Sequence, residues 1–439
     1  MDYISKDPEI LSYIEKKIIN KKMNKIKKNL INIKTSSTLA INETCEKLQK
    51  QGKEIFKFGL GQSPFPVPSS LVNELKKRAH EKNYLNVSGL LELRKQIAKY
   101  HTKKNKNKYH SDNVIIGPGS KELIFQTQLV LDGDLLLPRP SWVSYEPQAK
   151  ILQKKIHWIN ANAESNWHIT AKELNSICKK NKNKKKLLIL NSPNNPSGTI
   201  HNDLKSIAKV AKKNNVIILS DEIYCELNFS GKYESISHYY PSGTIISSGI
   251  SKWCGAGGWR LGALIFPKEL AYVKNILRNI VSETFTSVST PIQFAAIKAY
   301  SEDHSKYLFS SRLILETIGN YIFRELTEFG VKCQKPQGGF YMLCDFSDII
   351  KNNKKILNSK MLCEKLLRET GFAMLPASDF GINEKFLISR IAFVDFDGKK
   401  ALHYSQDKKN LSYHFLQNVC PNIINGIEKL KKWLEEINN

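Results

Sequence analysis

The sequence lacks any run of about 18 apolar residues, the length that a transmembrane helix needs. It also lacks the short apolar segment behind a basic start that is typical of a secretory signal. Residues 1–33 form a basic extension rich in lysine and asparagine, but they carry acidic residues, unlike the arginine-rich transit peptides of mitochondria. We therefore expect a cytoplasmic protein with no membrane segment.

Paired cysteines are missing as well. The eight cysteines form no Cys-x-x-Cys pair and no spacing typical of a zinc site. We expect no metal centre and eight free thiols, as is usual in a reducing compartment. The cysteines are Cys45, Cys178, Cys225, Cys254, Cys333, Cys344, Cys363 and Cys420.

Arginine is scarce, since only nine of the 67 basic residues are arginine. The lysines bring the formal net charge to +26, and many alternate with asparagine, as in residues 103–108 and 179–186. Lysine is a strongly hydrated point charge that makes poor bidentate contacts to bases and phosphates. We expect solvated loops and weak attraction to polyanions, with no specific nucleic-acid partner.

Short apolar runs alternate with helical segments through the centre of the chain, and each run is followed by a polar or glycine-rich turn. This alternation is typical of an α/β fold with a largely parallel sheet. Ligands bind such sheets beyond the carboxyl ends of the strands, where the polar turns lie. The expected strands are residues 114–116, 134–137, 186–190, 216–220 and 244–247.

The pattern of expected helices and strands changes after about residue 305, where a long helix precedes a mixed α+β pattern. We expect a large domain over residues 65–305. A small domain would combine residues 34–64 with 306–439, and residues 399–420 resemble an insertion before the last helix.

A lysine, Lys252, lies in a run of small residues from Ser248 to Gly262 that also contains Arg260. A lysine amine can form a Schiff base with an aldehyde, and an arginine fork can hold a phosphate. Glycines let the backbone approach a bulky ligand closely. Taken alone, such a lysine is more often a solvated loop residue, so the other motifs decide the interpretation.

Four further motifs follow expected strands. Each has an ordinary structural explanation: a helix start, an aromatic core residue, a tight Asn-Pro turn and a helix cap. In order, the motifs are Gly119-Ser120-Lys121, Pro-Ser-Trp142-Val-Ser-Tyr, Asn195-Pro-Ser-Gly and Asp221-Glu-Ile-Tyr224. Their order and spacing together are far more specific than any one of them.

From about Ile33 to the end, the chain resembles the class I/II aminotransferases of pyridoxal-phosphate fold type I, which include aspartate aminotransferase. The resemblance implies a mostly parallel seven-stranded sheet between helices, with a smaller α+β domain. It also implies transfer of an amino group from an L-amino acid to a 2-oxo acid, with aspartate- or glutamate-type substrates expected. Members of this family form homodimers with shared active sites.

The resemblance assigns roles around the ring of pyridoxal 5′-phosphate. Lys252 would hold the cofactor covalently and move a proton. Asp221 would pair with the pyridine nitrogen and keep it protonated. Tyr224 and Asn195 would hydrogen-bond the phenolic oxygen, and Trp142 would stack on the ring face.

The phosphate would be held by the N–H groups of residues 119–121 at a helix start and by Arg260. Tyr84 matches the tyrosine that reaches the phosphate of the neighbouring subunit; its ordinary explanation is core packing. Many members carry a serine three residues before the lysine, but this chain has Gly249 there. Ser248 or Ser251 could replace that hydroxyl, or nothing does.

Arg390 would bind the substrate α-carboxylate as a bidentate pair, helped by the backbone of Gly61 and by Asn195 and Trp142. Lys121 matches a lysine that reads the distal carboxylate in some members that use acidic substrates. It is otherwise a first-turn surface lysine.

Two other functions remain open from the sequence. One is a lyase or cyclising synthase on the same scaffold, because a fold does not determine its chemistry. The other is a binding protein that retains the fold without catalysis. The presence of Lys252, Asp221, Arg260 and Arg390 favours an enzyme over the second alternative.

Overall fold

The computed structural model describes residues 25–105, 107–351, 353 and 355–437. Most of the basic extension lies outside the described residues. Its described part includes a short 3₁₀ turn, η1 (Lys28–Leu30). The amide of Asn29 in this turn donates to the carbonyl of Ile151 at 2.9 Å, so this part of the extension lies against the end of a helix of the main body.

A seven-stranded sheet forms the centre of the molecule, in the order β2-β8-β7-β6-β5-β3-β4. All neighbouring pairs are parallel except those of β8, which runs antiparallel to both β2 and β7. This topology confirms the mostly parallel α/β sheet predicted from the sequence. The strands are β2 (Val114–Gly117), β3 (Asp134–Arg139), β4 (Ile156–Asn160), β5 (Lys186–Asn191), β6 (Ile217–Asp221), β7 (Thr244–Gly249) and β8 (Gly262–Ile265).

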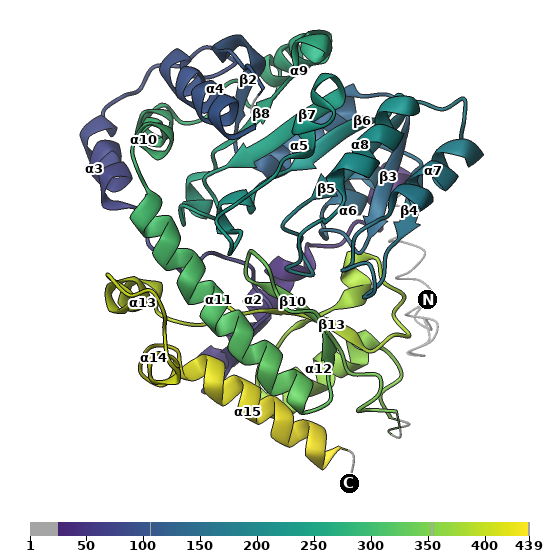
Figure 1. The fold of residues 1–439 in the computed structure, drawn as a ribbon, viewed down its shortest axis with the longest axis vertical. Helices are drawn as coiled ribbons and strands as arrows, with labels where there is room; N and C mark the ends of the chain where they lie inside the picture. The colour runs from purple at the N-terminus through teal and green to yellow at the C-terminus, as the bar shows by residue number, and fades with distance from the viewer. Residues whose placement is uncertain (1–24, 106, 352, 354, 438–439) are drawn as a thin grey trace, which may run out of the picture.

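Helices cover both faces of this sheet, as Figure 1 shows. Successive side chains of a strand point to opposite faces, and the central strand β5 is apolar at four consecutive positions. Leu187 and Ile189 pack against α5 (Ser120–Val130), α6 (Tyr145–Ile151) and α9 (Ala271–Ser282). Leu188 and Leu190 pack on the other face, against α7 (Ala171–Lys180) and α8 (Leu204–Lys213). Burial on both faces explains why the strand reads as a continuous apolar run.

A second, four-stranded antiparallel sheet has the order β12-β13-β10-β9. The long helix α11 (Ser305–Glu328) runs from the seven-stranded sheet to this smaller one, where it lies beside α15 (Pro421–Glu436) (Figure 1). The strands of this sheet are β9 (Lys332–Cys333), β10 (Tyr341–Asp345), β12 (Leu375–Pro376) and β13 (Ile388–Ala392).

The strand β1 (Phe56–Lys57) pairs in parallel with β11 (Phe372–Ala373), so a segment before the large sheet joins elements near the C-terminus. The proposed domain boundaries stay a prediction. Residues 399–420, expected as an insertion, contain most of α13 (Gly398–Tyr404) and all of α14 (Tyr413–Val419). The remaining α-helices of the described residues are α2 (Ser37–Lys50), α3 (Ser69–Arg78), α4 (Leu91–Asn105), α10 (Thr290–Ser301) and α12 (Ser359–Thr370).

Among the described residues, no helix combines the length and the apolar character needed to cross a membrane. All eight cysteines are free thiols, as the sequence predicts, and seven of them are buried.

Two glycines with left-handed backbone provide a test of the packing between the two sheets. Gly198 has φ +71°, and a Cβ there would overlap the carbonyl oxygen of Tyr341 on β10. Gly52 has φ +81° but no atom within 4 Å of the same Cβ position. We expect Gly52→Ala to lower the free energy of unfolding by about 1 kcal/mol, which is the backbone cost alone. Gly198→Ala should lower it by at least about 3 kcal/mol, because the clash adds to that cost.

Urea unfolding of both variants beside the wild type measures the difference. Equal losses for the two variants would show that the turn at Gly198 does not pack against β10 as described.

Candidate functional site

A pocket of about 500 Å³ lies where the ends of the central strands meet the smaller sheet. The register explains why: Asn191 and Asp221 end β5 and β6 and are partners, and Asp221 is also the partner of Ser247, two residues before the end of β7. Eleven of the residues singled out in the sequence line this pocket: Gly61, Ser120, Lys121, Trp142, Asn195, Asp221, Tyr224, Ser251, Lys252, Arg260 and Arg390. Residues from distant parts of the chain therefore share one cavity.

Lys252 follows β7 by three residues and lies half-buried in the pocket. Its Nζ donates to the carbonyl of Gly61 at 2.6 Å and lies 5.7 Å from the ring centre of Tyr224. Loss of water around the amine, together with the nearby cation of Arg390, lowers the pKa of Lys252 to about 8, although Asp221 opposes this shift. A larger fraction of neutral amine is therefore present near neutral pH, which is the form that attacks a carbonyl carbon.

Asp221 ends β6 and is almost fully buried. The hydroxyl of Tyr145 donates to its Oδ2 at 2.6 Å, and the amide of Asn191 donates to its backbone carbonyl at 2.9 Å. Burial raises the pKa of Asp221 to about 6, while the Tyr145 hydrogen bond opposes that rise. Among the described residues, no salt bridge reaches this carboxylate. It is thus available to a cationic partner in the pocket.

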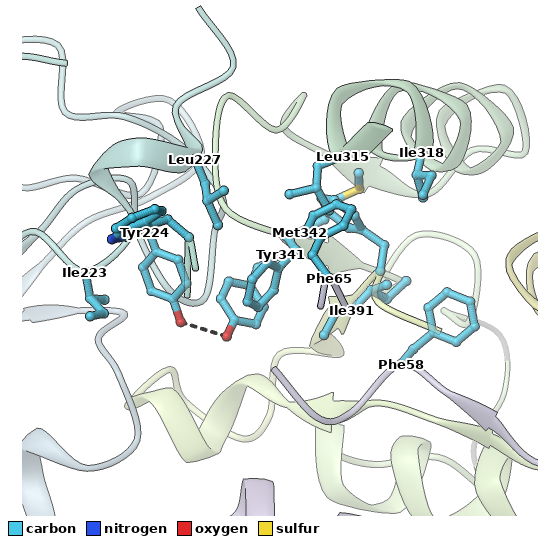
Figure 2. Packing of buried hydrophobic residues seen from close by; sticks show 14 of the residues in the cluster. Phe58, Phe65, Ile223, Tyr224, Leu227, Leu315, Ile318, Tyr341, Met342 and Ile391 are labelled. Carbon is cyan, nitrogen blue, oxygen red and sulfur yellow. Dashed lines mark hydrogen bonds between the residues drawn. The ribbon is translucent and has the colours of Figure 1, made fainter. Parts of the chain in front are cut away.

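Tyr224 connects the two sheets. Its hydroxyl lies 2.8 Å from the hydroxyl of Tyr341 on β10, and Figure 2 shows the two rings pointing toward each other from different elements. Tyr341 is also 3.4 Å from the carbonyl of Gly61, and a Cβ at Gly61 would overlap its hydroxyl. Glycine is therefore required at position 61 for this chain segment to approach the pocket.

The start of α5 and Arg260 form a cradle for an anion. Gly119 precedes the helix with φ +90°, and a Cβ there would overlap the guanidinium of Arg260. Arg260 itself adopts left-handed backbone and donates to the carbonyls of Gly257 and Pro118, each at 3.1 Å. No side chain of the described residues caps the N-terminus of α5, so its first N–H groups remain available to an anionic group.

Arg390, on β13, is fully buried. It donates to the side-chain oxygen of Asn195 at 3.1 Å and to the carbonyl of Gly59, and its guanidinium lies 4.6 Å from the ring centre of Tyr341. Burial lowers its pKa. Its Nε has no hydrogen-bond partner, and no carboxylate pairs with it among the described residues. Because an unpaired buried charge is costly, this arrangement favours an anionic ligand.

Lys121 and Trp142 lie together at the side of the pocket. The Nζ of Lys121 is 5.2 Å from the ring centre of Trp142, and both side chains are half-buried. Partial burial, together with the cation of Arg260, lowers the pKa of Lys121. Lys121 is therefore not an ordinary surface lysine, although a distal-carboxylate role stays a prediction.

Two positions predicted from the sequence, Tyr84 and Gly249, do not line the pocket. Tyr84 does not line the pocket of its own chain and is 88% exposed, so contact with a second subunit stays a prediction. At Gly249, a Cβ would lie 3.0 Å from the carbonyl oxygen of Leu261, which leaves little room for a serine. Of the two candidate replacements, Ser251 lines the pocket and Ser248 does not.

The sequence reasoning missed three residues of the site: Tyr145, Asn191 and Tyr341. Tyr145 is the last residue of the Trp142 motif, and Asn191 ends a strand, so both carried a positional signal. Tyr341 lies in Gly338-Gly-Phe-Tyr, on the second sheet, and nothing local to that segment indicates contact with Tyr224.

Comparison with known proteins agrees with this geometry. A sequence model of the family described as Aminotransferase class I and II matches residues 53–395, well over half of the chain. The chain belongs to the class I and II aminotransferases. Membership confirms the resemblance noted in the sequence and identifies this aminotransferase as an enzyme rather than a fold retained for binding alone.

Individual relatives are similar over most of their length. The aspartate aminotransferase of Bacillus sp. (strain YM-2) is 32% identical over 81% of this chain and 91% of the relative. The probable aspartate/prephenate aminotransferase of Rickettsia prowazekii (strain Madrid E) is 31% identical over 84% and 94%. A crystal structure of aspartate aminotransferase from Thermotoga maritima has a TM-score of 0.78 at 25% identity, covering 93% of this chain and 100% of its own.

The aminotransferase uses pyridoxal phosphate, and the pocket fits this cofactor. It offers the amine of Lys252, the unpaired carboxylate of Asp221 and the anion cradle at the start of α5. When bound, the cofactor supplies an aldehyde carbon for attachment and an electron-withdrawing ring.

The depressed pKa of Lys252 can be measured in the cofactor-free protein. Acylation requires a neutral amine, so labelling of Lys252 by acetic anhydride should rise with pH around a midpoint of about 8. Arg390→Gln should move that midpoint to higher pH, because it removes a cation that disfavours a second positive charge. Mass spectrometry of the labelled Lys252 peptide measures the profile. Arg324→Gln, an exposed control, should leave the midpoint unchanged, and an equal midpoint in both variants would contradict the electrostatic cause.

Tyr145→Phe tests the carboxylate. Loss of the hydroxyl should raise the pKa of Asp221 further above 6, so less of it is charged near neutral pH. The dissociation constant for pyridoxal phosphate should increase about tenfold or more, because a hydrogen bond to a charged group contributes roughly 1.5–3 kcal/mol. The increase should grow as the pH is lowered from 8 to 6. Quenching of tryptophan fluorescence measures binding, with Tyr240→Phe as a buried control; wild-type affinity in Tyr145→Phe would refute the role.

Proposed function

We propose that this aminotransferase moves the amino group of an acidic L-amino acid, aspartate or glutamate, to a 2-oxo acid in two half-reactions. The observation that carries the proposal is the buried guanidinium of Arg390, which has no carboxylate partner in the part of the chain that the structure describes. The same pocket contains two further cations, Lys121 and Arg260. Three cations exceed what one phosphate requires and suit a substrate with two carboxylates. The names of the relatives from Bacillus and Thermotoga support this choice.

Arg390 would hold the α-carboxylate of the substrate. Its hydrogen bond to Asn195 fixes the guanidinium plane, and the aromatic rings of Tyr341 and Phe380 lie at 4.6 and 5.0 Å from it. These contacts keep water away from the cation, which strengthens a charge-assisted bidentate bond. Gly61 lies beside this site through its contact with Tyr341.

Lys252 would both hold the cofactor and move the proton at the substrate Cα. A pKa of about 8 suits a group that must gain and lose a proton near neutral pH. Asp221, buried beside the hydroxyl of Tyr145, would keep the ring nitrogen protonated. Tyr224 and Asn195 would donate to the phenolic oxygen, and the hydrogen bond between Tyr224 and Tyr341 would hold that donor in place.

Arg260, Ser120 and the free N–H groups of α5 would bind the phosphate, and Trp142 would cover the ring. Lys121 would read the distal carboxylate, since it is half-buried at the pocket wall beside Trp142. Tyr84 would reach the phosphate of a second subunit, which implies a homodimer; its 88% exposure in one chain supports that role. A cytoplasmic location agrees with eight free cysteines.

The experiment is a half-reaction screen of the purified enzyme with each of the twenty amino acids. Conversion of the bound cofactor from its aldehyde form to its amine form is followed by absorbance. We expect aspartate or glutamate to react fastest. Release of ammonia or of an unsaturated product from the amino acid alone would instead indicate a lyase.

Two variants separate the carboxylate sites. Arg390→Ala should lower kcat/KM at least about 30-fold for every amino acid, because truncating one partner of a buried charge pair costs roughly 2–5 kcal/mol. Lys121→Ala should lower it only for acidic amino acids, by about tenfold, and leave alanine unchanged. Lys185→Ala, at an exposed position, is the matched control. An equal loss for acidic and neutral substrates in Lys121→Ala would refute its specificity role.

A further inference from the structure

Two cysteines lie opposite each other on neighbouring strands of the smaller sheet, away from the site described above. Cys333 lies on the edge strand β9 and Cys344 on its neighbour β10, and they are direct partners in the antiparallel register. Side chains of directly opposed residues lie on the same face of a sheet. Burial raises the pKa of the Cys344 thiol, and its contact with the Cys333 thiol raises that pKa further.

The register brings the two backbones within the reach of a disulfide. Directly opposed residues in an antiparallel pair have Cα atoms about 4.5 or 5.5 Å apart. Disulfides span Cα separations of about 4.4–6.8 Å, so either kind of pair falls inside the range. The cysteines are free thiols in this structure, and their register is compatible with a bond between them.

The two thiols differ in access. Cys344 is fully buried, whereas Cys333 on the sheet edge is partly exposed. A water-borne oxidant therefore meets Cys333 first, and Cys344 lies next to the product of that reaction. Buried Cys363 on α12 is another thiol near this sheet, but its Sγ contacts Ser389, which is the partner of Cys344 on the other side of β10.

This pair lies on the face of the sheet away from the catalytic pocket. Arg390 is the register partner of Leu343, and Ser389 is the partner of Cys344. Because successive residues of a strand point to opposite faces, Cys344 and Arg390 point in opposite directions. Arg390 lines the pocket, so a bond at Cys344 forms on the opposite face of the sheet from the pocket.

We propose that Cys333 and Cys344 are a reversible thiol–disulfide site that takes up a peroxide without loss of transaminase activity. Hydrogen peroxide oxidises the Cys333 thiol to a sulfenic acid and leaves as water. The sulfur of Cys344 then attacks the sulfenic sulfur, displaces its oxygen as a second water and forms the disulfide. In total two thiols and one peroxide give one disulfide and two waters.

The test uses the full-length holoenzyme treated with hydrogen peroxide and then with an alkylating agent. The lysine before Cys333 is a trypsin site, and Lys335-Pro336 resists cleavage, so both cysteines fall in one peptide, residues 333–351. We expect this peptide to become lighter by two hydrogens and to lose both alkylation sites. Dithiothreitol should restore both sites. A peptide that stays fully alkylated while other cysteines oxidise would overturn the proposal.

Variants identify the partner thiol. In Cys344→Ser the sulfenic acid at Cys333 has no partner, so it should persist or advance to sulfinic acid, which dithiothreitol does not reverse. Cys363→Ser is the matched control and should form the disulfide as the wild type does. If the disulfide no longer forms in Cys363→Ser, then Cys344 is not the partner of Cys333, and the proposal is refuted.

Activity is a separate readout. The oxidised wild type should keep its transamination rate within about twofold, because the bond lies behind the sheet. A loss of activity that dithiothreitol restores would overturn the second half of the proposal. The peptide measurement depends on no assumption about the substrate, so its result stands whatever the half-reaction screen shows.

Discussion

The register of three parallel strands is the constraint on which this enzyme depends. Because β5, β6 and β7 end side by side, Asn191 and Asp221 meet at one edge, and Lys252 follows three residues after β7. The apolar interior of these strands holds their ends in place, since the side chains on both faces are closely packed against helices. The amine of Lys252 and the carboxylate of Asp221 are therefore positioned by packing inside the sheet, away from the reacting atoms.

Burial of charge is the second consequence. In the pocket, the pKa of Lys252 is lowered, the pKa of Asp221 is raised, and the guanidinium of Arg390 has no carboxylate partner among the described residues. Each state is unfavourable in the cofactor-free protein, because an unpaired charge in a poorly solvated site costs free energy. Cofactor and substrate carry groups of complementary charge, so their binding offsets the free-energy cost of these unpaired charges. Before the ligands bind, uncharged side chains provide part of this compensation: Tyr145 donates to Asp221, and Asn195 accepts from Arg390.

Much of the site could be predicted from local sequence. Lys252, Asp221, Asn195 and Lys121 each follow an apolar run, and strand ends in a parallel sheet converge, so their meeting in one pocket follows from pattern and topology rules. Tyr341 could not be found in this way. Its contact with Tyr224 joins residues 117 positions apart, one in the turn after β6 and the other on β10, and no periodicity encodes how one sheet docks on the other.

The sequence by itself determined the α/β class, the mostly parallel sheet and the chemical types gathered at its edge, because apolar periodicity and turn residues act over short distances. Only the tertiary structure decided which cations stay unpaired, that Gly249 has little room for a side chain, and that Cys333 opposes Cys344. Those outcomes depend on burial and on strand register. Both are sums over contacts between segments that lie far apart in the chain, so no local pattern contains them.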